Sequence, residues 1–313
     1  MPKPKITVMG SFIVDLMARA HHLPAHGETV KGSRFMIGPG GKGANQGVAA
    51  CRSGSDVTMI TKIGTDAFAA IALDSFSKEG MDTSFVMQDG RYSTGSALIM
   101  VDENTSENQI VVTLGACDHI SPDEIETARQ QIEGSDILLT QLETNMEALE
   151  KVVDIAHKKG VRVILNPAPA PQQPLPGSLL KKIDILTPNE TEASILSGVG
   201  VSSFDDARMA ARQLRQKGVG TVIVTMGGKG AFVSSGEAEY VVEPFKVDVL
   251  DTTGAGDAFN GGLATALAGG MELPDAVRFA NATGALSTTR LGTAPSMPYR
   301  NEIEGLLKTQ GGS

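Results

Sequence analysis

Short apolar stretches rich in Val, Ile and Leu recur along the chain, and segments with helical spacing separate most of them. Runs of this kind predict strands, and strands that alternate with helices predict a parallel sheet covered by helices on both faces. The predicted strands are residues 6–9, 57–60, 137–140, 161–165, 183–186 and 221–225. We therefore expect an α/β fold with a central, mostly parallel sheet flanked by helices.

Two of the intervening helices are marked by their ends. Ser121 followed by Pro122 and two acidic residues predicts an N-cap and a first turn, and this helix would run toward Gly134. Apolar residues between Leu149 and Ala156 keep helical spacing until a glycine at position 160 supplies a C-terminal stop.

Two regions break the alternation of strands and helices. Residues 29–37 and 93–101 have strand character, and the second region is followed by a polar turn and a further strand at 109–114. Strands without intervening helices predict hairpins. We expect a small β-sheet, formed approximately by residues 12–40 and 92–115, that acts as a lid within one domain spanning residues 1–313.

Composition narrows the classes of function. The chain has 27 Lys and Arg against 36 Asp and Glu, a net charge of −9, and it contains no basic block, which argues against a nucleic-acid partner. Its apolar stretches are far shorter than the ~20 residues that span a bilayer, and its N-terminus lacks a signal-peptide core. Two cysteines cannot form a disulfide framework. We expect a cytoplasmic protein without a membrane partner.

The segment DTTGAGDAFNGGLATAL, residues 251–267, carries the most informative chemical pattern. Gly254, Ala255 and Gly256 precede an Ala-rich and Leu-rich helix, and a helix N-terminus fronted by glycines forms an anion hole. Asp257 would lie beside it as a general base that takes a proton from an attacking hydroxyl during phosphoryl transfer. The alternative is that Asp257 only caps the helix.

A second glycine-rich segment, GPGGKGANQGVAA, spans residues 38–50. It satisfies the spacing G-x-G-x-x-G, so a dinucleotide-dependent oxidoreductase is an alternative. Pro39 inside the turn and the predicted hairpin strand before it weaken that match. Two interpretations remain: the backbone approaches a polar ligand with Lys42 and Asn45 as donors, or the glycines serve helix packing.

Two further segments follow predicted strands. Asn189 and Glu192, three residues apart, can position magnesium-bound water beside phosphates, or they can cap a helix. Thr225 and Gly227 belong to a glycine turn at the carboxyl end of another strand, where ligands bind in open α/β sheets.

Together these segments resemble the ribokinase family, within the superfamily of carbohydrate and nucleoside kinases. The matching segments, in order along essentially the whole chain, are VMGSFIVD, GGKGANQ, LLTQLE, LNPAPA, LTPNETEA, VTMGGKGA, DTTGAGDAFNGG and TTRLGTAPSMP. The resemblance implies an ATP-dependent kinase that phosphorylates the 5-hydroxyl of a pentose, either ribose or 2-deoxyribose. It also implies a homodimer formed through the β lid. Another sugar or a nucleoside remains an alternative substrate.

The resemblance also implies residue roles, with Asp257 as catalytic base and residues 254–256 as the anion hole. The residues expected around the sugar are Asp15, Ile13, Gly41, Lys42, Asn45 and Glu143. Those expected around ATP and magnesium (Mg²⁺) are Asn189, Glu192, Thr225, Gly227 and Asn281. Those expected beside a potassium ion (K⁺) are Asp251, Thr253, Ser287, Arg290, Gly292 and Ser296.

One position departs from the family pattern. Ribokinases carry an Asn two residues before the sugar-binding Asp, and that Asn pairs with sugar hydroxyls, whereas this chain has Ile13. A 2-hydroxyl left without a partner costs ~1 to 3 kcal/mol. Deoxyribokinases carry an apolar residue at this point, so Ile13 favours 2-deoxyribose. The alternative is that lid or water contacts compensate and ribose is accepted.

Overall fold

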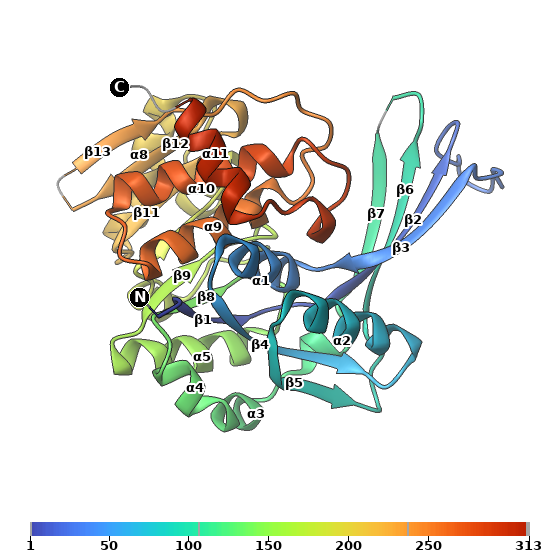
Figure 1. The fold of residues 1–313 in the computed structure, drawn as a ribbon, viewed down its shortest axis with the longest axis horizontal. Helices are drawn as coiled ribbons and strands as arrows, with labels where there is room; N and C mark the ends of the chain where they lie inside the picture. Colours follow the sequence, from blue (N-terminus) through green and yellow to red (C-terminus); the bar gives the residue numbers. More distant parts are fainter. Residues whose placement is uncertain (1, 106, 237, 311–313) are drawn as a thin grey trace.

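The computed structural model describes residues 2–105, 107–236 and 238–310. In these ranges nine strands form a main sheet, and four strands form a second sheet that projects from it (Figure 1). The order across the main sheet is β13 (Ala238–Val242), β12 (Ala231–Ser235), β11 (Thr221–Thr225), β10 (Ile185–Leu186), β9 (Arg162–Leu165), β8 (Ile137–Thr140), β1 (Lys5–Met9), β4 (Asp56–Gly64) and β5 (Asp82–Asp89). Neighbouring strands are parallel from β11 to β5, and β12 and β13 are antiparallel additions at one edge. The predicted α/β class is confirmed.

Helices bury both faces of the main sheet. In β8, Ile137 and Leu139 pack into the core on one face, and Leu138 packs into the core on the other. The helices of the first face are α1 (Lys42–Ser53), α2 (Ala67–Glu79), α9 (Ala255–Ala268), α10 (Leu273–Ser287) and α11 (Arg300–Thr309). Those of the second face are α3 (Pro122–Thr127), α4 (Arg129–Glu133), α5 (Met146–Lys159), α6 (Gly177–Leu180), α7 (Glu190–Ser197) and α8 (Phe204–Gln216). Because both faces are covered, the central strands are nearly continuous apolar runs.

The predicted helix between Ser121 and Gly134 is two helices. Ser121 caps α3 in a capping box with Glu124, as its sequence indicates. The chain then turns at Ala128, whose φ of −89° and ψ of 2° are not helical, and α4 begins at the next residue. The helix α5 ends as expected at Gly160, which has a φ of 79°.

The second sheet, which we call the lid sheet, has the order β3 (Arg34–Gly40), β2 (Ile13–Ala20), β6 (Gly95–Asp102) and β7 (Asn108–Thr113). The small separate sheet is confirmed, although β2 pairs with β6 in parallel, so it is more than two hairpins. The strand predicted at 29–37 begins instead at Arg34, which pairs with Arg19 one residue before the end of β2, so β2 is too short to pair with residues 29–32. The predicted turn at 102–108 includes residue 106, which lies outside the described residues.

The lid sheet extends away from the body beside α1 and α2 (Figure 1). Its strand β3 leads directly into α1, so the lid and the glycine-rich N-terminus of α1 are consecutive in the chain. Across the described ranges, no helix combines the length and apolarity needed to cross a bilayer.

Candidate functional site

A cavity of about 170 Å³ lies at the carboxyl ends of β9, β10 and β11. Open α/β sheets bind ligands at this edge because the loops that follow the strands converge there. The cavity is lined by Lys42, Asn166, Ala168, Thr187, Asn189, Glu192, Thr225, Gly254, Gly256, Asp257 and Asn260. It therefore joins residues from all four chemical segments that the sequence singles out.

The helix α9 begins at this cavity with the predicted glycine turn. Gly254 is its N-cap with a left-handed φ of 79°, which favours glycine, and Ala255 and Gly256 occupy the first two helical positions. The N–H groups of a first helical turn have no partner within the helix. A Cβ atom built on Gly256 would meet no atom within 4 Å, so open space faces this residue. The turn has the form of an anion hole.

Asp257 occupies the third position of α9, but it does not cap the helix. Its Oδ2 accepts a hydrogen bond from Nδ2 of Asn45 at 3.0 Å, and its Oδ1 accepts one from Nε2 of Gln46 at 3.0 Å. The capping alternative is therefore wrong. Burial raises the pKa of Asp257, while Lys42 and the two amide donors act in the opposite direction. A carboxylate in this position can accept a proton from a substrate hydroxyl.

The glycines before α1 have a different structure from the one that a dinucleotide site needs. Residues 38–40 belong to β3, and Gly41 is the N-cap of α1 with a φ of 89°. A Cβ atom on Gly43 would lie 2.6 Å from the main-chain N of Ser11, so this glycine permits close packing against the segment after β1. The phosphate-binding turn between a parallel strand and a helix is absent here, which removes the basis of the oxidoreductase alternative.

Further predicted sugar residues lie near Asp257. Oε2 of Glu143 accepts hydrogen bonds from Oγ of Ser11 at 2.5 Å and from the main-chain N–H of Lys42 at 2.9 Å. Burial, followed by the charge of Glu143, raises the pKa of Asp15 to about 6, and Asp257 adds to this effect. The structure thus gathers three carboxylates and the amide of Asn45 beside the N-terminus of α1.

Ile13 and Asp15 lie two residues apart on β2 and therefore on the same face of the lid sheet. Ile13 is 3% exposed, and its Cδ1 atom lies 2.5 Å from a Cβ atom built on Gly95 of the neighbouring strand. Ile13 is not among the residues that line the 170 Å³ cavity.

Asn189 and Glu192 form a capping box at the start of α7. Oδ1 of Asn189 accepts the N–H of Glu192 at 2.8 Å, and Oε2 of Glu192 accepts the N–H of Asn189 at 3.0 Å. Both residues also line the cavity, so the capping and ligand-binding interpretations are compatible. Burial raises the pKa of Glu192, and the charge of Lys42 opposes this effect.

The residues predicted beside potassium lie in two loops that Asp251 connects, except Ser287, which is the last residue of α10. Its Oδ1 accepts the N–H of Thr253 at 2.9 Å, and its Oδ2 accepts the N–H of Gly292 at 3.0 Å. The guanidinium of Arg290 is paired with Glu302. The hydroxyls of Ser287 and Ser296 donate to main-chain oxygens of Gly284 and Thr293. Within the described ranges, no cluster of three or more His, Cys, Asp or Glu could hold a metal ion.

Two predicted nucleotide residues do not line the cavity. Nδ2 of Asn281 donates to the main-chain oxygens of Val242 and Glu243, both at 3.1 Å. Gly227, with a φ of 53°, begins a short 3-10 helix after β11. Thr225 does line the cavity, as its position at the end of β11 predicts.

Several polar residues of the site were missed in the sequence. They are Ser11, Gln46, Gln141, Asn166, Thr187 and Asn260. Gln141, Asn166 and Thr187 each directly follow a buried strand of the parallel sheet. That position could have identified them as site residues from the sequence, because the carboxyl ends of parallel strands meet at one edge of the sheet.

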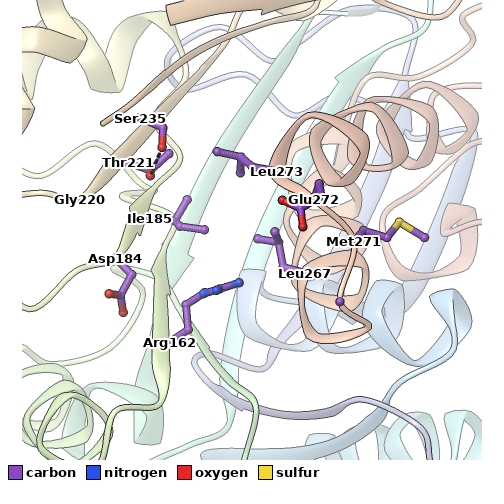
Figure 2. A pocket seen from close by; sticks show the side chains of 11 residues that line it. Arg162, Asp184, Ile185, Gly220, Thr221, Ser235, Leu267, Met271, Glu272 and Leu273 are labelled. Carbon is purple, nitrogen blue, oxygen red and sulfur yellow. Dashed lines mark hydrogen bonds between the residues drawn. The ribbon is translucent and has the colours of Figure 1, made fainter. Parts of the chain in front are cut away.

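A larger cavity, of about 570 Å³, lies on the opposite side of the main sheet, at the amino ends of its central strands (Figure 2). Arg162, Ile185 and Thr221 are the first residues of β9, β10 and β11, and Leu267 and Glu272 form the facing wall. None of the residues that line this cavity was predicted to act in catalysis or binding.

Comparisons with known proteins agree with the geometry of the carboxyl edge. Residues 3–300 match the model of the pfkB family of carbohydrate kinases. The chain is 43% identical to the ribokinase of Haemophilus influenzae, with 97% of this chain and 98% of that protein covered. It is 40% identical to the deoxyribokinase of Salmonella typhi, with 96% and 98% covered. The solved structure of Arabidopsis thaliana ribokinase complexed with ribose and ATP has a TM-score of 0.90 and 30% identity, with 98% and 99% covered.

Proposed function

The chain belongs to the pfkB family of carbohydrate kinases, and on that premise we propose that it transfers a phosphoryl group from ATP to the 5-hydroxyl of a pentose. One observation carries this proposal. The buried carboxylate of Asp257 lies directly behind the glycine turn of α9, at a cavity that also contains Lys42. A base and an anion hole in this arrangement are what phosphoryl transfer to an alcohol requires.

In the proposed reaction, Asp257 takes the proton of the 5-hydroxyl as the oxygen attacks phosphorus. The N–H groups of the first turn of α9 stabilise the negative charge that develops on the transferred group. The side chain of Lys42 adds positive charge on the same cavity wall. The lid sheet would exclude water, so that the sugar and not a water molecule receives the phosphoryl group.

The donor set at the start of α7 fits magnesium. Asn189 and the buried carboxylate of Glu192 offer oxygen atoms at the cavity, and magnesium prefers oxygen ligands while retaining several waters. We propose that these residues hold the water shell of a magnesium ion, which neutralises charge on the phosphates when it is bound.

The loops joined by Asp251 fit a monovalent cation better than a transition metal. They contribute one carboxylate, and the side chain of Arg290 is engaged with Glu302. Main-chain oxygens must therefore supply most of the ligands, which suits potassium. Activity in a potassium buffer should clearly exceed activity in a buffer whose only monovalent cation is a large organic one. Equal rates would contradict the potassium site.

Between the two pentoses, we propose a preference for 2-deoxyribose over ribose. Ile13 lies on the same face of β2 as Asp15, so its methyl groups would lie near carbon 2 of a sugar bound by that carboxylate. The relatives include both ribokinases and a deoxyribokinase, so their names leave this choice open.

We also propose that the protein acts in the cytoplasm, where ATP is abundant. We further propose that it forms a homodimer through the lid sheet. Large apolar side chains of the lid are about half exposed or more in the single chain: Phe35, Ile37, Leu98, Ile110, Val111 and Val112. Apolar surface of this kind is stabilised by a partner. Sedimentation should give the mass of two chains, and Phe35→Asp with Val111→Asp should give the mass of one. A wild-type monomer at micromolar concentration would contradict the dimer.

An assay of ADP release with ribose, 2-deoxyribose, fructose and adenosine tests the reaction. The pentoses should give the highest kcat/KM, and the product should carry phosphate on carbon 5. A nucleoside preference would favour another branch of the same superfamily. Sugar-dependent reduction of NAD or NADP without ADP release would overturn the kinase proposal.

A further inference from the structure

Buried side-chain amides form a hydrogen-bonded chain behind Asp257. Nε2 of Gln141, which follows β8, donates to Oε1 of Gln46 on α1 at 2.7 Å. Nε2 of Gln46 donates both to Oδ1 of Asp257 and to Oδ1 of Asn166, each at 3.0 Å. Nδ2 of Asn166 then donates to the main-chain oxygen of Thr187 at 3.0 Å. This series of hydrogen bonds connects α1, α9 and the loops after β8, β9 and β10.

These partners determine the orientation of the Gln46 amide. Gln141 donates to its oxygen, so the NH₂ group must face Asp257 and Asn166, and both of its protons are then used. The reverse orientation would place an amide oxygen against a carboxylate oxygen. Gln46 and Gln141 are fully buried, and neither lines the cavity. A bound substrate therefore cannot supply the contacts that Gln46 makes.

We infer that Gln46 is a positioning residue for phosphoryl transfer: it holds Oδ1 of Asp257 from behind while Asn45 holds Oδ2, so that the carboxylate keeps one orientation toward the cavity. Gln141 acts one step further away, by holding the amide of Gln46. This inference rests on the proposed role of Asp257 as the base. It goes beyond that role because Gln46 does not touch the reacting atoms.

The charges around Asp257 explain why a neutral amide suits this position. Lys42 on α1 is the nearby cation, and the carboxylates of Glu143, Asp15 and Glu192 face Asp257 from the loop after β8, from β2 and from α7. An additional carboxylate would add to the repulsion, and a lysine would form an ion pair with the base. A glutamine donates a hydrogen bond without changing the net charge.

The test compares Gln46→Met with wild type in the full-length enzyme. A misplaced reactive group can lower the rate about 10²-fold, so kcat should fall roughly 10- to 100-fold, while KM for the sugar and for ATP should change less than about 3-fold. The acid limb of the kcat profile, which reports the base in the substrate complex, should move to higher pH, because the ionised carboxylate loses a donor. Unchanged kcat in a folded Gln46→Met protein would overturn the inference.

Thr265→Val is the matched control. Thr265 lies on α9, donates a hydrogen bond to Ala50 of α1 and accepts one from Ser55 just after α1, so this variant also removes buried hydrogen bonds of α9 to α1 and to the segment that follows it. It should lower Tm without changing kcat. An equal loss of kcat in this control would mean that helix packing, and not orientation of the base, explains the effect.

The Asp257→Asn background separates failure of the inference from failure of the proposed function. If Gln46 acts through Asp257, adding Gln46→Met to Asp257→Asn should change the residual kcat less than 2-fold. A further 10-fold loss would overturn the positioning role. Full activity of Asp257→Asn alone would overturn the base, and the inference with it. If Gln46→Met does not fold, Gln141→Met decides the question, since kcat should fall about 3- to 10-fold.

Discussion

The two cavities lie at opposite ends of the same strands. One lies at the amino ends of β9, β10 and β11, here called the amino edge, and the other at their carboxyl ends, the carboxyl edge. The cavity at the amino edge, about 570 Å³, is more than three times the volume of the cavity at the carboxyl edge, about 170 Å³. At the amino edge, Thr221 and Ser235 bond to each other and Asp184 accepts the N–H of Val163. At the carboxyl edge, Asp257 is held by two amides and lines the same cavity as the glycines at the N-terminus of α9.

Volume therefore does not identify the chemical site in this protein. Polar groups at the amino edge bond mainly to their own neighbours, as the ends of strands generally do. At the carboxyl edge, two amides of α1 hold the carboxylate of Asp257, and Gln46 connects them to polar groups in the loops after β8, β9 and β10. Burying several polar groups at one place costs free energy unless they are hydrogen-bonded. Substitutions at the two edges should show whether catalysis depends on the carboxyl edge alone.

The largest effect is expected from Gly256→Val. Open space around Gly256 and its helical backbone allow the variant to fold, but the added methyl groups would occupy the space of the transferred phosphoryl group. We expect kcat to fall more than ~10³-fold, as for loss of an anion hole donor, with Tm nearly unchanged. Measurable turnover near the wild-type rate would show that no phosphate approaches this turn.

Asp257→Asn should lower kcat ~10²- to 10⁴-fold, because the amide keeps the shape of the site but cannot accept the proton. Substrate KM should change little. Steady-state kinetics with a pentose and ATP provide the measurement. Retention of more than a tenth of the wild-type kcat would contradict the role of base.

Ile13→Asn should change the choice of sugar. The wild type should prefer 2-deoxyribose, and the variant should raise kcat/KM for ribose relative to 2-deoxyribose about 10-fold, since one hydrogen bond contributes ~1.4 kcal/mol. Ile13→Leu is the control that keeps the surface apolar. A wild type that already prefers ribose, or an unchanged ratio in the Asn variant, would show that Ile13 does not contact carbon 2.

The raised pKa of Asp15 predicts that kcat/KM for the sugar depends on pH. Its pKa is raised to about 6, mainly by burial, so the carboxylate is ionised above that pH and protonated below it. As pH falls through 6, kcat/KM for the sugar should fall several-fold, because the neutral carboxyl is a weaker acceptor for sugar hydroxyls. The step near pH 6 should be absent in Asp15→Asn. Its persistence there would assign the titration to another group.

The smallest effect is expected at the amino edge. Arg162→Ala and Glu272→Gln change two charged residues of the larger cavity and touch no residue of the proposed site. We expect kcat and both KM values within about 2-fold of wild type, as for surface substitutions that change stability by only ~0.5 kcal/mol. A 10-fold change in either variant would show that the two edges are coupled.

The fold class and the segments that carry the chemistry can be predicted from local patterns in the chain. Buried strands are apolar on both faces, so β1, β4, β8, β9 and β11 are visible as short Val-rich and Ile-rich runs. The glycine turn before Asp257 is also visible, because only its local conformation matters for the pattern. Local patterns were insufficient for the two-helix break at Ala128 and for the start of β3, which depend on what lies opposite.

How these segments meet depends on contacts between residues that are far apart in the chain. Gln46, Gln141, Asn166 and Asp257 are separated by up to 211 residues in the chain, yet they form one hydrogen-bonded unit. The position of Gln141 and Asn166 directly after buried strands places them at this edge, but no local pattern shows that they bond to Gln46. Parallel strands bring their carboxyl ends to a single edge, and burial there favours a hydrogen-bond partner for each polar group, although Oδ1 of Asn45 and Oε1 of Gln141 have none among the described residues. These partners come from other elements of the fold, so the hydrogen bonds are visible in the tertiary structure and not in the local sequence.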